Sequence, residues 1–185
     1  MLKCKKTHNS TLTYMQLGRK VMRAIIELMR PKQWSKNFFV FAAIIFSGNF
    51  LHTSVLENNI LTFILFCMTS STIYVLNDIV DVEKDKCHPD KKNRPIASGR
   101  VSKNKAITLD IILLILVICL SSIFLNIEIL LIFLTYIIVN IFYSFKLKNI
   151  VIIDVMTIAF GFVLRVESGS IATGVQVSPW LFLCT

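Results

Sequence analysis

The chain has 185 residues, of which 55% are hydrophobic and 17% charged, and its formal net charge is +9. A mean hydropathy of +0.68 with this much charge is unusual for a soluble domain and typical of a membrane protein whose charges lie outside the bilayer. The basic residues are not interleaved with aromatic ones as in nucleic-acid-binding domains, so we expect no nucleic-acid partner. The five cysteines form no CxxC pair, which argues against a disulfide framework and a zinc site.

The N-terminal segment is polar and basic and lacks the order of a signal peptide, because the first apolar run begins only near Phe38. Residues 1 to about 18 are expected to be loosely ordered. Residues 19–30 have the pattern of a short basic amphipathic helix on the membrane surface. We therefore expect a cytoplasmic segment over residues 1–30 and a transmembrane domain over residues 31–185.

Five apolar runs are long enough, or nearly so, to cross a hydrocarbon core about 30 Å thick, which takes around 20 helical residues. The runs lie near residues 37–55, 59–77, 106–126, 128–145 and 149–166, and a sixth begins near Ser178. The chain is therefore predicted to be an all-α polytopic transmembrane helix bundle. The sixth run stops at Thr185 without a polar flank, so we expect a truncated form of a longer protein.

Lysine and arginine residues gather in alternate loops between these runs. Nine precede the first run, eight lie between the second and third, and Lys146 and Lys148 lie between the fourth and fifth, whereas residues 52–58 and 126–128 have none. Short loops rich in lysine and arginine stay on the cytoplasmic side of a membrane. This predicts an integral protein of the cell (inner) membrane whose N-terminus and polar loops face the cytoplasm.

The polar segment between the second and third runs begins with a row of acidic residues. If the second helix continues, Asp78, Asp81 and Asp85 fall within an arc of about 60° and a rise of about 10 Å. Three carboxylates so close repel one another unless a cation lies between them, and Asn77 adds an amide oxygen. Hard oxygen donors suit Mg²⁺, which shares substrate phosphates as further ligands. The pattern predicts a site for a divalent metal and a diphosphate.

Basic residues follow the acidic row in a loop that two prolines and a glycine interrupt. Lys91 and Arg94 are candidates to bind phosphate groups beside the metal. A solvated, salt-bridged face is the more common role of any single lysine in such a loop. His88 is a candidate base, although a loop histidine beside a proline more often makes only a polar contact.

Further polar residues lie inside the apolar runs or at their edges. Lys36 and Asn37, at the start of the first run, are either ordinary anchors or phosphate contacts on the same face as the acidic row. In the fifth run, Asp154, Gly161 and Arg165 share one stripe, because eleven residues make three helical turns to within about 20°. Such charges usually face the bundle interior. The alternatives are that the Arg165 side chain snorkels to the far membrane interface and that Asp154 only caps the helix close to the other interface. Close helix packing is the expected role of Gly161.

Two motifs together resemble a known family. Residues 77–85, NDIVDVEKD, match the NDxxDxxxD signature of the UbiA superfamily of intramembrane prenyltransferases, and residues 94–99, RPIASG, match the motif that follows it. From about residue 28 onward the chain is most similar to the decaprenyl-phosphate phosphoribosyltransferases. That likeness rests on RPKQWSKN (30–37), on His88, Pro89 and Lys91, on YSFKLK (143–148), and on Asp154 followed by GFVLR (161–165). The resemblance implies about nine membrane helices, of which this chain is the N-terminal part.

The resemblance also implies a reaction, in which phosphoribose moves from 5-phosphoribosyl diphosphate to a polyprenyl phosphate with release of diphosphate, for cell-envelope polysaccharide precursors. Mg²⁺ held by Asn77, Asp78, Asp81 and Asp85, with the three aspartates as catalytic residues, stabilises the leaving group in this reading. The substrate-binding residues that it implies are Lys36, Asn37, Lys91, Arg94, Tyr143, Lys148, Asp154 and Arg165. A phosphate monoester is already an anionic nucleophile, so the reaction demands no strong base.

Two other functions are weighed against this one. A prenyltransferase that moves a polyprenyl group from its diphosphate to an aromatic acceptor uses the same metal ligands, but Ser144 and Leu147 favour the phosphoribosyl branch over the YPxxKR loop of the aromatic prenyltransferases. A non-catalytic membrane subunit or a transporter is less favoured. Transporters usually place polar residues near the bilayer midplane, whereas in this sequence they gather at one end of the spans.

Overall fold

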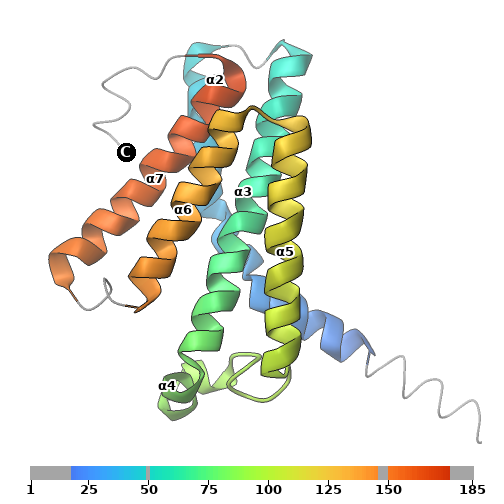
Figure 1. The fold of residues 1–185 in the computed structure, drawn as a ribbon, viewed down its shortest axis with the longest axis vertical. Coiled ribbons are helices and arrows are strands. Elements are labelled where there is room, and N and C mark those ends of the chain that lie inside the picture. Colours follow the sequence, from blue (N-terminus) through green and yellow to red (C-terminus); the bar gives the residue numbers. More distant parts are fainter. Residues whose placement is uncertain (1–17, 49–50, 146–149, 176–185) are drawn as a thin grey trace, which may run out of the picture.

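The computed structural model describes residues 18–48, 51–145 and 150–175, and every regular element within these ranges is helical (Figure 1). A helix over residues 18–29 comes first. The elements that follow are η1 Pro31–Phe41, α2 Ala42–Ser47, α3 Thr53–Val80, α4 Val82–Cys87, η3 Lys91–Asn93, α5 Lys103–Phe124, α6 Ile127–Phe145 and α7 Val151–Thr173. The predicted all-α class is confirmed. The expected sixth run and nearly all of the expected loose N-terminal stretch lie outside the described residues.

The first apolar run is not the single regular helix predicted over residues 37–55. η1 is a 3₁₀ helix with Pro31 in its first turn, as the proline predicts, because this position has no intrahelical N–H bond to lose. The helix α2 continues only to Ser47, and the chain then turns at Gly48, whose φ of 71° lies in the left-handed region. Both η1 and α2 pack against α7. The run is therefore a broken segment that belongs to the bundle.

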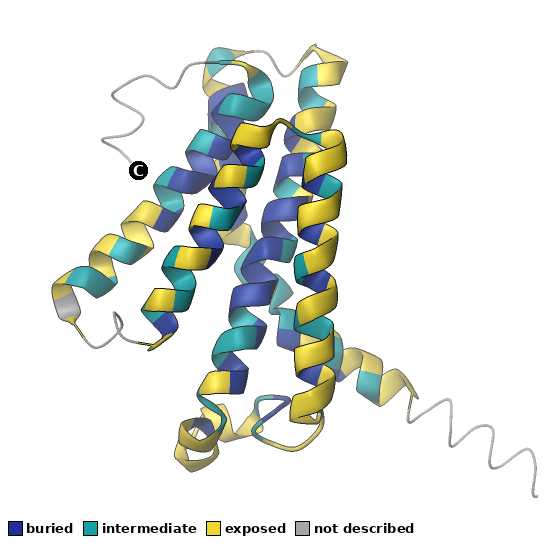
Figure 2. Ribbon diagram, in the orientation of Figure 1, coloured by how far each residue is buried: buried dark blue, intermediate teal, exposed yellow. Residues whose placement is uncertain are grey.

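The helix α3 is the central element of the bundle, and it packs against η1, α5, α6 and α7. Its dark ribbon in Figure 2 runs through the middle of the molecule. Its buried hydroxyl residues include Thr69, Ser70, Ser71 and Thr72, and all four donate to carbonyl oxygens one turn earlier. Small hydroxyl residues let neighbouring helices approach closely without unsatisfied polar groups. Phe66 of α3 packs edge-on against Phe133 and Tyr136 of α6.

Three of the described helices are long and apolar enough to cross a membrane: α3, α5 and α6. The outward face of α5 exposes large aliphatic side chains, among them Ile111, Ile115 and Ile123. An apolar face of this kind suits the hydrocarbon core of a bilayer. The helix α7, which carries Asp154, Arg165 and Glu167, is not among the three, although it covers the fifth predicted run and extends seven residues past its expected end.

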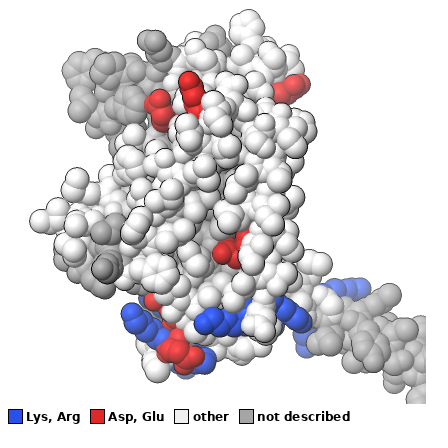
Figure 3. All heavy atoms as spheres, viewed as in Figure 1, with Lys and Arg blue, Asp and Glu red and all other residues white. Residues whose placement is uncertain are grey.

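Basic side chains gather at one end of the molecule, whereas acidic side chains lie at both ends. Figure 3 shows lysine and arginine side chains at the lower end, where Figure 1 places α4, the start of α5 and the helix over residues 18–29. The middle of the visible face is almost entirely uncharged, apart from one acidic patch. The polar end of the bundle is therefore the end at which α3 finishes and α5 begins. That this end faces the cytoplasm stays a prediction.

Candidate functional site

The acidic row lies at a break between α3 and α4. The helix α3 ends at Val80, and Asp81 connects it to α4 with a φ of −91° and a ψ of 8°. Asp78 and Asp85 are buried, with 2% and 3% of their surface exposed, whereas Asp81 is half-buried. Among the described residues no three His, Cys, Asp or Glu side chains gather where they could hold one metal ion. The structure therefore does not show the predicted cluster of three carboxylates. Two buried carboxylates, those of Asp78 and Asp85, instead point to one common position.

That place is filled by the guanidinium group of Arg94. Its Nη1 donates to Asp85 Oδ2 at 2.6 Å and to Asp78 Oδ1 at 3.2 Å. Arg30 donates to the same oxygen of Asp78 and lies over the ring of Tyr74, 5.2 Å from its centroid. Two carboxylates and two guanidinium groups thus neutralise one another at the end of α3. The sequence analysis placed Arg94 beside the acidic row but expected it to bind phosphate, and it did not single out Arg30.

The backbone at Arg30 supports a special role for this residue. Arg30 has a φ of 53° and is the only residue other than glycine with a positive φ among those described. This left-handed conformation costs on the order of 1 kcal/mol for a residue with a Cβ. It separates the helix over residues 18–29 from η1 and lets the arginine side chain reach Asp78. The only signal in the sequence was its position at the head of RPKQWSKN.

The acidic end of the site fits a divalent metal in its chemistry. The Nη1 atom of Arg94 marks a position at which one positive charge contacts oxygens of both Asp78 and Asp85. Carboxylate oxygens are the ligands that Mg²⁺ prefers. The amide oxygen of Asn77 accepts a hydrogen bond from the hydroxyl of Ser144 and is thereby oriented from α6. A metal between the two carboxylates would require Arg94 to move away from them.

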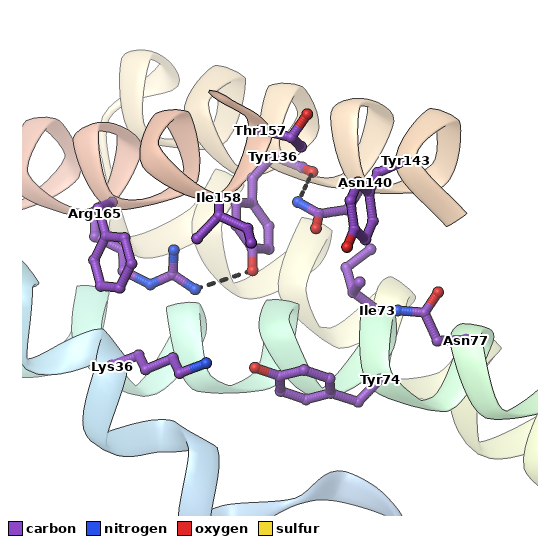
Figure 4. Close-up of a pocket in the computed structure, with 11 residues that line it drawn as sticks. Lys36, Ile73, Tyr74, Asn77, Tyr136, Asn140, Tyr143, Thr157, Ile158 and Arg165 are labelled. Atoms are coloured by element: carbon purple, nitrogen blue, oxygen red, sulfur yellow. Dashed lines mark hydrogen bonds between the residues drawn. The ribbon is translucent and has the colours of Figure 1, made fainter. Parts of the chain in front are cut away.

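Next to the acidic row lies a pocket of about 210 Å³ between η1, α3, α6 and α7 (Figure 4). Its lining residues are Lys36, Ile73, Tyr74, Asn77, Tyr136, Asn140, Tyr143, Thr157, Ile158, Phe162 and Arg165. Two of these side chains are cations, three are phenols, two are amides, and none is a carboxylate. Cations and neutral hydrogen-bond donors without a competing acid are suited to an anion such as a phosphate group. Asn77 is the residue that the pocket shares with the acidic row.

Arg165 is held inside the bundle by three elements. Its Nε donates to Asn37 Oδ1 at 2.8 Å, its Nη2 to the hydroxyl of Tyr136 at 3.0 Å, and its Nη1 to the carbonyl oxygen of Gly161. Only 5% of its surface is exposed. The alternative that it snorkels to the far interface is wrong, because α7 continues to Thr173 and places Arg165 well inside the helix. Gly161 gives it room, since a Cβ there would lie 3.2 Å from Arg165 Nη1.

Asn37 orients a side chain of the pocket without lining the pocket itself. It is fully buried, and its Nδ2 donates to Ser70 Oγ at 3.1 Å and to Cys67 Sγ at 3.2 Å. With its carbonyl oxygen it accepts from Arg165, so both ends of the amide are used. Asn37 does not line the pocket, whereas its neighbour Lys36 does. The structure therefore separates two residues that the sequence analysis treated as a pair.

The remaining predicted residues are placed as follows. Tyr143 donates from its hydroxyl to Asp154 Oδ1 at 2.7 Å, which joins the end of α6 to the first turn of α7 at the rim of the pocket. Lys91 is exposed on η3 and does not line the pocket. His88 accepts from the backbone N–H groups of two following residues through its Nδ1, which is the polar contact expected of a loop histidine. Lys148 lies outside the described residues.

The sequence analysis did not identify four polar residues of the pocket: Tyr74, Tyr136, Asn140 and Thr157. All four lie within apolar runs, where a tyrosine or threonine is an ordinary packing residue. Only their position around one pocket distinguishes them, and in Figure 4 the hydroxyls of Tyr136 and Tyr74 point toward Arg165 and Lys36. Helix phase relative to a neighbouring helix decides this direction, and a single sequence does not state that phase.

Comparison with known proteins matches these features to a family. The model of the UbiA prenyltransferase family matches residues 37–185. The chain is 33% identical over 167 residues to a decaprenyl-phosphate phosphoribosyltransferase of Mycolicibacterium smegmatis, covering 88% of this chain and 52% of that protein. It is 35% identical over 163 residues to the enzyme of the same name from Corynebacterium glutamicum, covering 86% and 49%. The chain thus spans about half the length of the curated relatives it matches.

Solved structures share the fold. A digeranylgeranylglyceryl phosphate synthase structure superimposes with a TM-score of 0.76 and 28% identity, covering 89% of this chain and 58% of that chain. A UbiA homologue from Archaeoglobus fulgidus, bound to DMAPP and Mg²⁺, superimposes with a TM-score of 0.72 and 21% identity, covering 86% and 57%. The second likeness concerns the fold alone.

Proposed function

Because this chain belongs to the UbiA prenyltransferase family, we propose that it carries part of the active site of an Mg²⁺-dependent intramembrane transferase. The reaction proposed is transfer of phosphoribose from 5-phosphoribosyl diphosphate to a polyprenyl phosphate, with release of diphosphate. One observation carries the proposal: a pocket lined by cations and phenols, free of lining carboxylates, adjoins a pair of buried aspartates through Asn77. A diphosphate ester needs both kinds of environment at once.

The acidic side of the site receives the metal in this proposal. Asp78 and Asp85 converge on one cation position, with Asn77 and Asp81 as further oxygen donors beside them. A bound Mg²⁺ supplies charge that stabilises the departing diphosphate. Arg94, released from the carboxylates, keeps a planar donor fork that matches phosphate oxygens. The arginine that neutralises the aspartates thus becomes a diphosphate ligand, Lys91 adds charge from the loop after α4, and Lys148 is a further candidate to bind phosphate.

The basic side of the site receives a phosphate group. Lys36 and Arg165 supply the charge, and the hydroxyls of Tyr74 and Tyr136 are the neutral donors nearby. Arg165 reaches the pocket already oriented by Asn37 and by the carbonyl oxygen of Gly161, so little side-chain entropy is lost when it binds an anion. Asp154 fixes the orientation of the Tyr143 hydroxyl by accepting a hydrogen bond from it.

The chemistry of the chain agrees with an anionic nucleophile. Cleavage at the ribose C1 develops positive charge on the sugar and negative charge on the leaving diphosphate, and a polyprenyl phosphate oxygen attacks without prior loss of a proton. Among the described residues that line the pocket there is no histidine, and His88 is engaged with the loop backbone. The apolar helix surfaces give the polyprenyl chain a place beside the bundle while its phosphate reaches the polar end.

A second candidate function is favoured by the family itself. Transfer of a polyprenyl group from its diphosphate to an acceptor also expels diphosphate and uses the same donors, and a neighbour with the same fold is solved with DMAPP and Mg²⁺. In that reaction the pocket holds an uncharged or weakly acidic acceptor. Two cations at the pocket, Lys36 and Arg165, favour an acceptor that carries a phosphate group.

The deciding experiment uses membranes that contain the full-length gene product. They are incubated with Mg²⁺, labelled 5-phosphoribosyl diphosphate and polyprenyl phosphate, and label is followed into the lipid phase. Metal-dependent label in lipid supports phosphoribosyl transfer, with Glu83→Gln as a variant that keeps activity and Asp78→Asn as one that loses it. Transfer from a prenyl diphosphate to an aromatic acceptor, with no ribose in lipid, would move the protein to the second function. The same membranes, probed for accessibility of Cys87 from each side, test the cytoplasmic placement of the acidic loop.

A further inference from the structure

The helix over residues 18–29 has an apolar side that the bundle covers only in part. Ala24 and Leu28 are buried against α3, α5 and the loop between them. Met22 and Ile26, one turn apart, have 60% and 50% of their surface exposed. At 100° per residue these two side chains lie between the buried stripe and the basic residues of the helix. An apolar strip of the helix therefore faces away from the protein core.

Basic side chains border this exposed strip. Arg19, Lys20 and Arg23 stand against a single acid, Glu27, within residues 18–29, which leaves a net charge of +2 (three basic minus one acidic). Glu27 is already engaged, since its two carboxylate oxygens accept from Arg100 at 2.6 and 2.8 Å. Within the described part of the chain, no ion pair neutralises Lys20 or Arg23.

Two of these cations, Lys20 and Arg23, line a recess at the surface. A pocket of about 350 Å³ is lined by Lys20, Val21, Arg23 and Arg100. Figure 1 shows the helix leaving the side of the bundle near the first turns of α5, and Figure 3 shows basic side chains at the same level. This is the level at which α5, a helix apolar enough to cross a membrane, begins at Lys103. The recess thus lies at the level of the first turn of a helix that is long and apolar enough to cross a membrane.

We propose that the helix over residues 18–29 is an interfacial helix whose recess, lined by Lys20, Arg23 and Arg100, binds the phosphate headgroup of an anionic phospholipid. Met22 and Ile26 lie more than 100° around the helix from Lys20, so they enter the apolar region of the bilayer on another side of the helix from that headgroup. An amphipathic helix of this composition binds anionic bilayers in two ways, by burying its apolar side chains and by the attraction of its basic side chains to the lipid headgroups. The occupant is a lipid of the surrounding membrane and is separate from the substrates of the proposed reaction.

The site has a consequence for the acidic row. The clamp between Glu27 and Arg100 fixes the end of the helix to the loop that follows the acidic row, and Arg30 comes directly after it. Arg30 in turn donates to Asp78. A lipid that holds the helix in place therefore also holds the segment from which Arg30 reaches its carboxylate.

The experiment measures lipid binding to the full-length protein by native mass spectrometry, with phosphatidylglycerol compared with phosphatidylcholine. We expect a preference for phosphatidylglycerol on the order of ten-fold, from two cations near one anionic headgroup. The variant Lys20→Glu/Arg23→Glu is expected to lose the preference. The matched control, Lys84→Glu/Lys92→Glu, makes the same change of net charge at two exposed lysines near the acidic row and is expected to keep it.

Three results would overturn the proposal: equal binding of both lipids by the wild type, a preference unchanged in Lys20→Glu/Arg23→Glu, or an equal loss in the control variant, which would indicate a general charge effect. Hydrogen exchange of residues 18–29 in nanodiscs provides a second measurement. Protection is expected to be greater in phosphatidylglycerol than in phosphatidylcholine. Protection that is the same in both lipids contradicts a lipid contact at this helix.

Discussion

Arg165 and Asn37 are 128 residues apart in the sequence and share a hydrogen bond of 2.8 Å inside the bundle. Around this bond the guanidinium also lies 5.0 Å from the ring centroids of Phe66 and Tyr136. Within the described residues no carboxylate is paired with Arg165, so neutral groups and aromatic faces stabilise its charge. A cation stabilised in this way remains able to attract an anion in the pocket.

The first prediction concerns this arginine. Arg165→Lys keeps the charge but loses the fork that reaches Asn37, Tyr136 and the carbonyl oxygen of Gly161 together. Hydrogen bonds to a charged group contribute about 1.5–3 kcal/mol each. We therefore expect a fall in kcat/KM of at least a hundred-fold and a lower thermal unfolding temperature in detergent. Arg19→Lys, at an exposed position, is the matched control. Wild-type turnover in Arg165→Lys would contradict the assignment of Arg165 to the substrate-binding site.

The second prediction concerns the acidic row. Asp78→Asn and Asp85→Asn are each expected to abolish turnover while membrane insertion is kept, because each variant removes a carboxylate from the shared cation position. Asp78→Asn should also lower stability, since Arg30 and Arg94 both lose a charged partner. Glu83→Gln changes an exposed carboxylate that pairs with the exposed Lys86, and this variant is the control. Turnover and unfolding temperature are measured side by side. Full activity in both aspartate variants would refute the metal assignment.

The third prediction concerns the contact of α7 with η1. A Cβ at Gly169 would lie 1.8 Å from the backbone carbonyl oxygen of Val40. Because backbone cannot rotate away as a side chain can, Gly169→Ala must separate the two elements, at a cost of about 1–3 kcal/mol. We expect a clear fall in unfolding temperature, and lower activity, because η1 carries Lys36 and Asn37. Gly18→Ala, where nothing lies within 4 Å, should leave both unchanged.

The fourth prediction concerns Asp110 of α5. It lies on the stripe of α5 that also carries the buried Ala106, Leu113 and Val117, and within the described ranges its buried Oδ1 has no hydrogen-bond partner. An unpartnered carboxylate inside a membrane helix is costly, so Asp110→Asn is expected to raise the stability by about 1 kcal/mol. Thermal unfolding in detergent measures this gain, with Asp90→Asn in the exposed loop as the control. A fall in stability would contradict a cost of this buried carboxylate oxygen.

The fifth prediction concerns pH. The hydrogen bonds from Arg100 lower the pKa of Glu27 below its ordinary value of 4.5. A carboxylate with a lowered pKa stabilises the fold above its unfolded pKa, and this contribution is lost as the pH falls through the folded one. Since the pair is largely exposed, the effect is small. We expect hydrogen exchange of residues 18–29 to rise as the pH falls below about 4.5, after correction for the intrinsic rate. In Glu27→Gln this added rise should disappear.

Much of the fold followed from the order of apolar and polar residues. The runs near 59–77, 106–126 and 128–145 correspond to α3, α5 and α6, because twenty apolar residues in a membrane have no stable alternative to a helix. The position of the run over residues 37–55 was predicted, but its broken form was not. The break at Gly48 and the 3₁₀ geometry depend on packing against α7. The family resemblance of the acidic row is confirmed by the match over residues 37–185.

The sequence by itself determined the chemistry that this protein contains: which residues are carboxylates, amides and cations, and that the acidic row and the basic loop after it lie at one end of a helix bundle. Tertiary structure decided which of them meet. Arg165 could be read as an interfacial anchor until the position of α7 against η1 placed it on Asn37, and Arg30 had no role until a left-handed turn brought it to Asp78. The reason is physical, since helix propensity and hydropathy act within a segment, whereas the relative rotation of two helices is set by side chains of both.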